Sequence, residues 1–276
     1  MRRWLTTSRW PRLLAVSLAL AVAGALLLFT FGHRYQIKKT FSSAEESWEA
    51  GDYQGAIELY QVIVDENPSD PLAEEAQFRI GNIYYLFLQR DRAAVQTFRD
   101  LIKRDSSRPL SIRAQGLLGE IFEKRLGDQR QAIVEYQRLI NLAPEAPDVD
   151  GAQLAVARCY FKMGDFEQAR EEYEIHLERY PESPRRDRAL AGVANCHYVT
   201  RSFLQAIQYY RLVMDGTDDV QLRAEAGYGI ASSLEEAGDL EGAQEEFERI
   251  RGDYPNPELL EQRLARIGDR LTKKNQ

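Results

Sequence analysis

The sequence has few of the residues that most often carry chemistry. It contains three histidines and two cysteines among 276 residues. No two histidines stand four residues apart, and none stands at a metal-ligand spacing from a cysteine, so a metal site is not expected. Glycine-rich phosphate loops and the nucleophile turn of serine hydrolases are also missing. We therefore predict that the chain is not an enzyme, with no catalytic, cofactor-binding or metal-binding residues.

Positive charge is scarce beyond the N-terminus. Residues 1–39 hold seven of the 36 basic residues and none of the 43 acidic ones, which leaves 29 basic and 43 acidic side chains in residues 40–276. The formal charge of this larger part is −14. A nucleic-acid partner is not expected, because its binding surface needs clustered Lys and Arg. Anionic headgroups should repel the same part, so membrane contact is expected only through an N-terminal anchor.

What the sequence does contain is a repeat. The stretch MGDFEQAREEYEIHLERYP at 163–181 has a Gly-Asp turn, a helical apolar face and a terminating proline. Three of its positions recur: a small residue in a first helix, an alanine in a second helix, and an aromatic residue one turn later. The small residues are Ala44, Gly81, Gly119, Ala157, Ala194 and Ala231; the alanines are Ala56, Ala94, Ala132, Ala169, Ala206 and Ala243; the aromatics are Tyr60, Phe98, Tyr136, Tyr173, Tyr210 and Phe247.

The spacing of these residues predicts stacked helical hairpins. Successive alanines are 38, 38, 37, 37 and 37 residues apart. Only Ala or Gly fits where two helices cross closely, since a larger side chain would cost about 1–3 kcal/mol by overpacking. The aromatic residue is expected to fill the wedge between one hairpin and the next. One hairpin cannot bury such a face alone, but a stack of hairpins can.

This framework of small, small, aromatic and proline residues, over about residues 40–255, resembles the tetratricopeptide repeat (TPR) family. The resemblance implies an all-α, right-handed α-solenoid of about six TPR hairpins. The period is longer than the one common in the family, so we expect longer connections between hairpins. The linkers at 67–76 and 180–190 resemble those of bacterial envelope members. Examples are the lipoprotein of the outer-membrane β-barrel assembly machine and the periplasmic coordinator of the Tol–Pal system.

The two ends of the chain differ from the repeats. Residues 256–276 predict a capping helix and tail, with Pro257 at its first position and an apolar stripe of Leu260, Leu264, Ile267 and Leu271. Residues 13–31 contain no charge and would span about 29 Å as a helix, which is the thickness of a bilayer core. We therefore predict one transmembrane helix at 13–32, preceded by a short basic cytoplasmic tail at 1–12 and followed by the TPR solenoid at 33–255.

The orientation of this anchor follows from the flanking charges. Arg2, Arg3, Arg9 and Arg12 precede the apolar run, whereas Arg34, Lys38 and Lys39 follow it. The small excess favours an N-terminus in the cytoplasm and a solenoid in the periplasm, across the inner membrane. Two alternatives stay open. A cleaved signal peptide would have a shorter apolar region and a small-residue cleavage site, and the solenoid could instead face the cytoplasm.

Two cysteines and two histidines stand within the repeat framework. Cys159 and Cys196 hold the same position in neighbouring repeats, whose helices pack about 8–10 Å apart. A disulfide needs Cα atoms within about 7 Å, so we expect free, buried thiols. His176 and His197 stand at framework positions that are normally apolar. Both are expected to be packed histidines.

The TPR resemblance also implies a groove lined by the first helices of the hairpins. Carried over, the groove positions are Phe41, Trp48, Phe78, Asn82, Tyr85, Glu120, Lys124, Leu154, Arg158, Phe161, Lys162, Asn195, Tyr198, Tyr228 and Glu235. Phe78 and Phe161 are expected in the core, and for Trp48 and Tyr85 core and groove stay open. The predicted partner-binding residues are Phe41, Trp48, Asn82, Tyr85, Arg158, Lys162, Asn195, Tyr198 and Tyr228. The family's carboxylate clamp is not visible, because Phe41 and Phe78 stand where a lysine is needed.

These features predict a membrane-anchored scaffold that binds other proteins in a bacterial cell-envelope complex. The partner would be a complex subunit or an extended peptide. One alternative is a membrane-tethered chaperone accessory that binds exported polypeptides, and another is a cytoplasm-facing TPR adaptor. A glycan hydrolase would need paired carboxylates in a pocket, whereas the sequence offers scattered surface acids.

Overall fold

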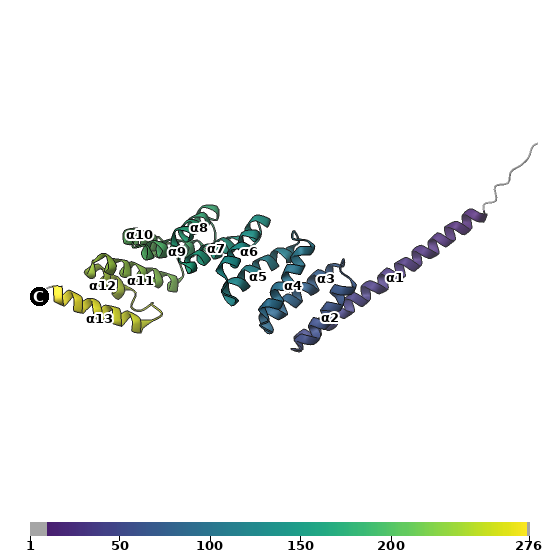
Figure 1. Ribbon diagram of the computed structural model, residues 1–276, viewed down its shortest axis with the longest axis horizontal. Coiled ribbons are helices and arrows are strands. Elements are labelled where there is room, and N and C mark those ends of the chain that lie inside the picture. Colours follow the sequence, from purple (N-terminus) through teal and green to yellow (C-terminus); the bar gives the residue numbers. More distant parts are fainter. Residues whose placement is uncertain (1–9, 275–276) are drawn as a thin grey trace, which may run out of the picture. The chain divides into compact units, whose positions relative to one another are not determined.

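The computed structural model describes the backbone of residues 10–274 and the side chains of residues 30–273. Over this range it forms thirteen α-helices and two π-helical turns and no strand, so the predicted all-α class is confirmed (Figure 1). The chain divides into two compact units, Met1–Leu101 and Ile102–Gln276. The unit boundary falls inside one helix, Asp91–Arg104.

The first unit contains two helical hairpins. Its helices are α1 (Trp10–Glu49), α2 (Tyr53–Glu66), α3 (Pro71–Asn82) and α4 (Asp91–Arg104), with the π-helical turn η1 (Ile83–Phe87) extending α3. The C-terminal part of α1 pairs with α2, where Ala44 and Ala56 are fully buried. The first buried side chain among the described part of α1 is Ile37. Only the end of this long helix therefore belongs to the first hairpin.

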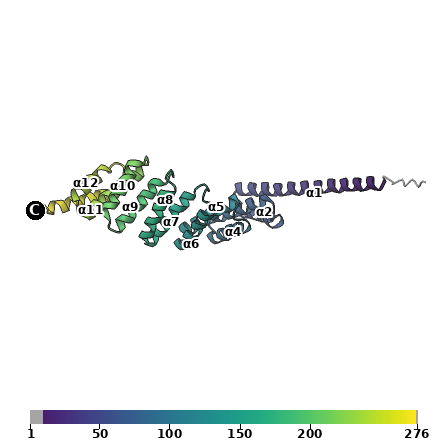
Figure 2. The ribbon, with the colours of Figure 1, turned by 90° about the horizontal axis from the view of Figure 1, so that it is seen from above.

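The second unit contains four hairpins and a final helix. Its elements are α5 (Pro109–Glu120), η2 (Ile121–Arg125), α6 (Gln129–Leu142), α7 (Val149–Met163), α8 (Phe166–Arg179), α9 (Arg186–Val199), α10 (Phe203–Gly216), α11 (Val220–Ala237), α12 (Leu240–Arg249) and α13 (Pro257–Lys274). Each helix packs against the next, and the hairpins follow one another along the unit (Figure 2). Leu260 and Ile267 of α13 are fully buried against α12, which confirms the predicted cap.

Four of the six hairpins build their turn as the Gly-Asp pair predicts, whereas the other two turn at Gln89 and Arg201. Gly164 adopts a φ of 81°, a left-handed conformation that favours glycine. The next residue, Asp165, then caps α8 by accepting the backbone N–H of Gln168 at 3.4 Å. Asp52, Asp128 and Asp239 cap α2, α6 and α12 in the same way. Each such cap contributes about 1 kcal/mol and fixes where the second helix starts.

The aromatic residue of each hairpin lies against small residues of first helices. A Cβ placed on Gly81 would lie 2.4 Å from the Phe98 ring of the same hairpin. A Cβ on Gly192 would lie 2.4 Å from the ring of Tyr173, which belongs to the preceding hairpin. The aromatics therefore pack both within and between hairpins, as the wedge argument requires.

The two π-helical turns explain why the repeat period varies along the chain. The spacing from the alanine of one hairpin to the small residue of the next is the same throughout. The spacing from small residue to alanine is one residue longer in the hairpins that begin at Gly81 and Gly119 than in the others. Those two first helices end in η1 and η2, and a π turn accommodates one extra residue. This variation lies inside the hairpins, whereas longer connections were expected between them.

The predicted anchor belongs to the first helix. Helix α1 runs without a break from Trp10 to Glu49. Of the predicted transmembrane helix 13–32, side chains are described only from residue 30. Of the predicted tail 1–12, residues 1–9 lie outside the described residues. Within the described part of the chain, no helix is long and apolar enough to cross a membrane. The anchor, its cleavage and its orientation stay predictions.

The histidines that the sequence placed in the framework are packed. His176 is fully buried in α8, and its ring nitrogens have no hydrogen-bond partner in the described protein. Burial lowers its pKa from the usual value. His197 is partly buried and stacks on Tyr209 with ring centroids 5.5 Å apart. Both residues therefore act as part of the helix packing, as predicted.

Both cysteines are free and buried, which makes them testable markers of the fold. Cys159 and Cys196 are 0% and 1% exposed, and burial raises the pKa of each thiol to about 12. We expect no alkylation of either thiol by iodoacetamide at neutral pH in the native protein, because the thiolate is the reactive form. Both should react in denaturant. Mass spectrometry counts the adducts, and native labelling as fast as in denaturant would contradict this packing.

Candidate functional site

One position of the repeat carries either an aromatic ring or a carboxylate. It is the residue four places after the small residue of the first helix, and we call it the +4 position. Four of its six residues are aromatic and two are glutamates: Trp48, Tyr85, Glu123, Phe161, Tyr198 and Glu235. The glutamates are the residues of interest, because both side chains are nearly fully buried and both hold arginines from a following helix.

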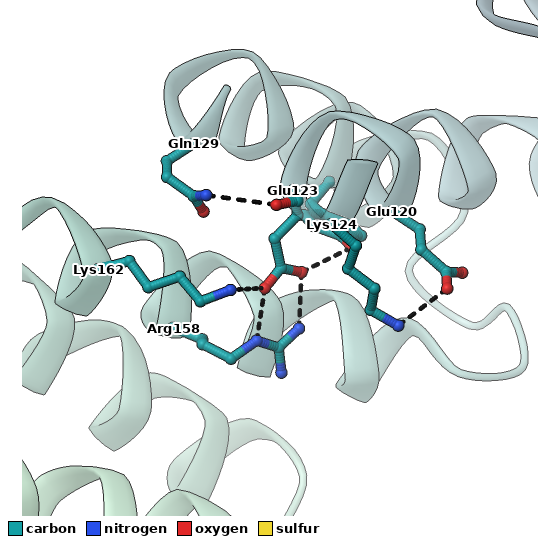
Figure 3. A network of polar contacts seen from close by, with 7 residues as sticks. Glu120, Glu123, Lys124, Gln129, Arg158 and Lys162 are labelled. Carbon is teal, nitrogen blue, oxygen red and sulfur yellow. Dashed lines mark hydrogen bonds and ion pairs between the residues drawn. The ribbon is translucent and has the colours of Figure 1, made fainter. Parts of the chain in front are cut away.

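Glu123 forms the centre of a charged cluster between the first helices of neighbouring hairpins (Figure 3). It lies on η2 and is 3% exposed. Its carboxylate accepts hydrogen bonds from Arg158 Nε at 2.6 Å and Nη2 at 2.7 Å, and from Lys162 Nζ at 2.9 Å. The hydroxyl of Tyr136 also donates to it at 3.1 Å. Arg158 and Lys162 come from α7, so the cluster joins two first helices.

The cluster keeps a buried carboxylate ionised. Burial by itself would raise the pKa of Glu123, since it disfavours the charged form. The hydrogen bonds and charges of Arg158 and Lys162 outweigh burial and lower the pKa to about 2. Glu123 is therefore a fixed negative charge at neutral pH, and it holds the two cations in place.

The low pKa of Glu123 predicts an acid-dependent loss of stability. Its folded pKa of about 2 lies below the usual value of 4.5, so its stabilising contribution is present above pH 4.5 and disappears as the pH falls towards 2. Replacing Glu123 with Gln should flatten this part of the stability-versus-pH profile. Hydrogen exchange of the α5 and α7 amides between pH 5 and pH 2 measures how the local stability around Glu123 depends on pH. An unchanged slope in the Glu123→Gln variant would contradict the assignment.

The two cations of the cluster still have unused donors. Their side chains are 39% exposed for Arg158 and 44% exposed for Lys162. Among the described residues, Arg158 Nη1 and the other N–H groups of Lys162 have no partner. Lys124 pairs with Glu120 at 2.8 Å beside them, so the five residues carry three positive and two negative charges. This part of an acidic chain can therefore receive a carboxylate or carbonyl oxygen from a partner.

The first unit offers an aromatic surface instead. Trp48 is partly exposed, lies edge-on to Phe87 at 6.0 Å and under the guanidinium of Arg79 at 5.9 Å. Phe87 is 42% exposed and stacks on Tyr53 at 4.7 Å. Aromatic rings beside an arginine are the usual anchors of protein interfaces.

The other predicted groove residues of the first unit divide between core and surface. Tyr85 is 9% exposed and Phe78 is 4% exposed, so both rings belong to the core. This matches the expectation for Phe78 and resolves the open alternative for Tyr85. Phe41 packs edge-on against Tyr60 at 5.3 Å and is partly exposed, as is Asn82.

The C-terminal groove positions are partly taken by the cap. Tyr228 stacks on Tyr254 at 4.7 Å, and its hydroxyl accepts a hydrogen bond from Arg263 of α13 at 3.2 Å. Glu235 lies within 3.5 Å of three arginines of α13, which are Arg263, Arg266 and Arg270. Tyr228 and Glu235 therefore secure the capping helix.

The remaining predicted residues of this end lie nearer the surface. Asn195 is exposed and accepts the Tyr210 hydroxyl hydrogen bond at 2.6 Å. Tyr198 is partly exposed and packs against Phe203 at 5.9 Å. Leu154 is 7% exposed and lies in the core, whereas Phe161 is partly exposed and meets Phe166 at 5.2 Å. The expectation that Phe161 belongs to the core is therefore only partly met.

Sequence reasoning overlooked the residue that organises the charged cluster. Glu123 was absent from the predicted groove, although its neighbours Glu120 and Lys124 were included. A signal existed, because Glu123 and Glu235 interrupt an otherwise aromatic +4 position. Phe87 and Tyr53 were also overlooked. Phe87 lies at the end of η1, and Tyr53 begins the second helix α2, whereas the prediction considered only first helices.

Comparisons with known proteins agree with this architecture. Sequence profiles described as tetratricopeptide repeat match residues 75–107, 125–198 and 225–257, which together are about half of the chain. No curated protein matches the sequence. Each of the matched ranges includes most or all of a hairpin, namely α3–α4, α7–α8 and α11–α12.

Similar solved structures show the same fold at low sequence identity. PilW, described as a widely conserved type IV pilus biogenesis factor, is 18% identical with a TM-score of 0.56, over 82% of this chain and 97% of PilW. Pseudomonas aeruginosa PilF is 15% identical with a TM-score of 0.56, over 83% and 97% of the two chains. A tetratricopeptide repeat protein of Parabacteroides merdae is 14% identical with a TM-score of 0.54, over 84% and 98%.

The repeat spacing, the hairpins and the profile matches lead to the same family. Six hairpins carry the small and aromatic residues in register, and a terminal helix closes the last of them. The chain is therefore a tetratricopeptide repeat protein.

Proposed function

We propose that this protein is a membrane-anchored scaffold that binds another protein in a bacterial envelope complex, with its solenoid on the periplasmic side. The observation that carries the proposal is the continuity of α1 from Trp10 to Glu49. The uncharged run at 13–31 is long enough to cross a bilayer core as a helix. Because the same helix enters the first hairpin, the solenoid would be held to the membrane without a flexible linker.

The surfaces of the first helices support binding rather than catalysis. The first unit presents Trp48, Phe87 and Arg79, and the second presents Arg158 and Lys162 with unused donors. Buried carboxylates such as Glu123 hold these cations in a fixed geometry. Preorganised contacts of this kind lower the entropy lost on binding. An anchor would add to this by confining the protein near membrane-bound partners.

The likeness to PilW supports a role in the envelope. PilW is described as a type IV pilus biogenesis factor, and its fold matches over most of both chains. Envelope assemblies need scaffolds that hold subunits together, and stacked helical repeats provide extended surfaces for this purpose. By this proposal the present chain acts as such a scaffold, with a complex subunit as its partner.

Cysteine labelling of whole cells tests the membrane topology. Leu204 is 72% exposed, and both native thiols are buried, so a Leu204→Cys variant provides one accessible thiol. We expect a membrane-impermeant maleimide to label it in intact cells that admit the reagent to the periplasm. A Ser8→Cys variant, in the predicted cytoplasmic tail, should be labelled only after lysis. The opposite pattern would favour the cytoplasm-facing adaptor, and loss of the first residues from the mature chain would favour a cleaved signal.

A further inference from the structure

A pocket in the first unit shares one residue, Phe41, with the predicted partner-binding groove. It has a volume of about 320 Å³ and lies between α1 and the start of α3. Arg34, Lys38 and Phe41 line it from α1, and Asp70, Pro71 and Leu72 line it from the other side. It therefore combines two cations with mainly apolar walls.

The two cations of the pocket are available to a ligand. Arg34 and Lys38 stand four residues apart, so they lie on one face of α1. Both side chains are exposed, and within the described part of the chain neither forms an ion pair. The single carboxylate of the pocket, Asp70, is engaged as the cap of α3, where it accepts the backbone N–H of Leu72 at 2.8 Å. With two cations and one carboxylate, the pocket keeps a formal charge of +1.

The position of the pocket along α1 indicates where such a ligand would come from. The predicted membrane segment ends at residue 32, so at 1.5 Å per residue Arg34 and Lys38 lie about 3 and 9 Å beyond it. The headgroup layer on each side of a bilayer is about 5–8 Å thick. Phe31 and Tyr35, which are 79% and 63% exposed, lie close to Arg34 along α1, at the predicted end of the membrane segment. Exposed aromatic rings are enriched where a membrane helix leaves the hydrocarbon core.

We propose that this pocket binds the headgroup of an acidic phospholipid, such as phosphatidylglycerol. Arg34 and Lys38 would contact the phosphate. Phe41, which lies farther from the bilayer core along α1, would pack with Pro71 and Leu72 against the carbon atoms of the terminal glycerol of the headgroup. The inference rests on the membrane anchor of the proposed function. It also revises one expectation, because a chain that is acidic overall gains one local attraction to the membrane. Headgroup binding would fix the height and rotation of α1, and with them the direction of the first hairpin.

The test uses the full chain reconstituted in nanodiscs that contain equal amounts of phosphatidylcholine and phosphatidylglycerol. Native mass spectrometry measures how many molecules of each lipid stay bound to the protein after it is released from the nanodisc. We expect the wild type to retain phosphatidylglycerol selectively. Lys38→Gln should weaken this retention about 5-fold, which corresponds to roughly 1 kcal/mol for one cation near a membrane surface. Arg34→Gln should act similarly.

The neighbouring lysine provides a matched control. Lys39 lies next to Lys38 but does not line the pocket, so Lys39→Gln removes the same charge outside it. We expect Lys39→Gln to retain the lipid as the wild type does. Equal losses in both lysine variants would overturn the pocket in favour of diffuse attraction. Full displacement of the lipid by inorganic phosphate or glycerol phosphate would identify a soluble anion as the ligand, and so overturn the lipid assignment.

Failure of the anchor and failure of the pocket give different results. A chain that leaves the nanodisc altogether would contradict the proposed membrane anchor. A chain that stays in the nanodisc without any preference for phosphatidylglycerol would contradict only the lipid site. Circular dichroism of each variant confirms that its helices are formed before the lipids are counted.

Discussion

Replacing Phe98 with alanine is expected to destabilise the second hairpin by about 4 kcal/mol. Phe98 is fully buried, lies 5.8 Å from the ring of Phe78 and packs directly over Gly81. The substitution therefore opens a cavity that the flanking helices cannot fill. Since repeat proteins open locally, the measurement is native-state hydrogen exchange of the α3 and α4 amides.

A double-mutant cycle with Gly81 shows whether this contact is the cause. A methyl group on Gly81 would lie 2.4 Å from Phe98, so Gly81→Ala alone should cost about 1–3 kcal/mol by overpacking. In the Phe98→Ala background the same methyl group enters the cavity, and its cost should disappear or reverse. Simple additivity of the two effects would contradict the packing of the repeat.

Replacing Arg158 with alanine is the second change with a large expected effect. It removes two of the four hydrogen bonds on the buried carboxylate of Glu123 and leaves Lys162 and Tyr136 as its partners. Breaking a buried ion pair commonly costs about 3–5 kcal/mol, and the remaining lysine should keep this loss near 3 kcal/mol. Hydrogen exchange of the α5 and α7 amides measures the loss.

Lys124 is the matched control for Arg158. Its side chain is 54% exposed and pairs with Glu120, which is 34% exposed, within the same cluster. Exposed pairs contribute about 0–1 kcal/mol, so Lys124→Ala should change exchange little. Arg158→Ala should also raise the pKa of Glu123, which moves the acid-dependent loss of stability to higher pH. Equal effects of the two variants would show that Glu123 does not depend on Arg158.

The repeats could be predicted from the sequence because each hairpin is specified by residues that are close together in the chain. Ala157, Ala169 and Tyr173 fix a hairpin through spacing alone, and Gly164 with Asp165 fixes its turn. The cap followed from Pro257 and the apolar stripe of α13 for the same reason. These signals depend on residues a few turns apart, which a single sequence displays directly.

The candidate site was less predictable because it depends on contacts between hairpins. Glu123 and Arg158 are 35 residues apart, and their pairing requires the packing of η2 against α7. The π turns were also missed, since one extra residue in a helix leaves no change in residue type. Tyr228 was predicted as free groove surface, but its stacking on Tyr254 and its contact with Arg263 depend on where the cap docks.

Site-specific photo-crosslinking in cells tests the central claim most directly. Probes at Lys162 and Asn195 report on the first helices, and probes at Val134 of α6 and Leu212 of α10, which are 39% and 52% exposed, report on the second helices. A scaffold that uses its first helices predicts one dominant envelope protein captured at Lys162 and Asn195 and none at the two controls. Many exported chains at these sites would instead indicate a chaperone accessory. Capture only at Val134 and Leu212, or capture of cytoplasmic proteins, would contradict the account.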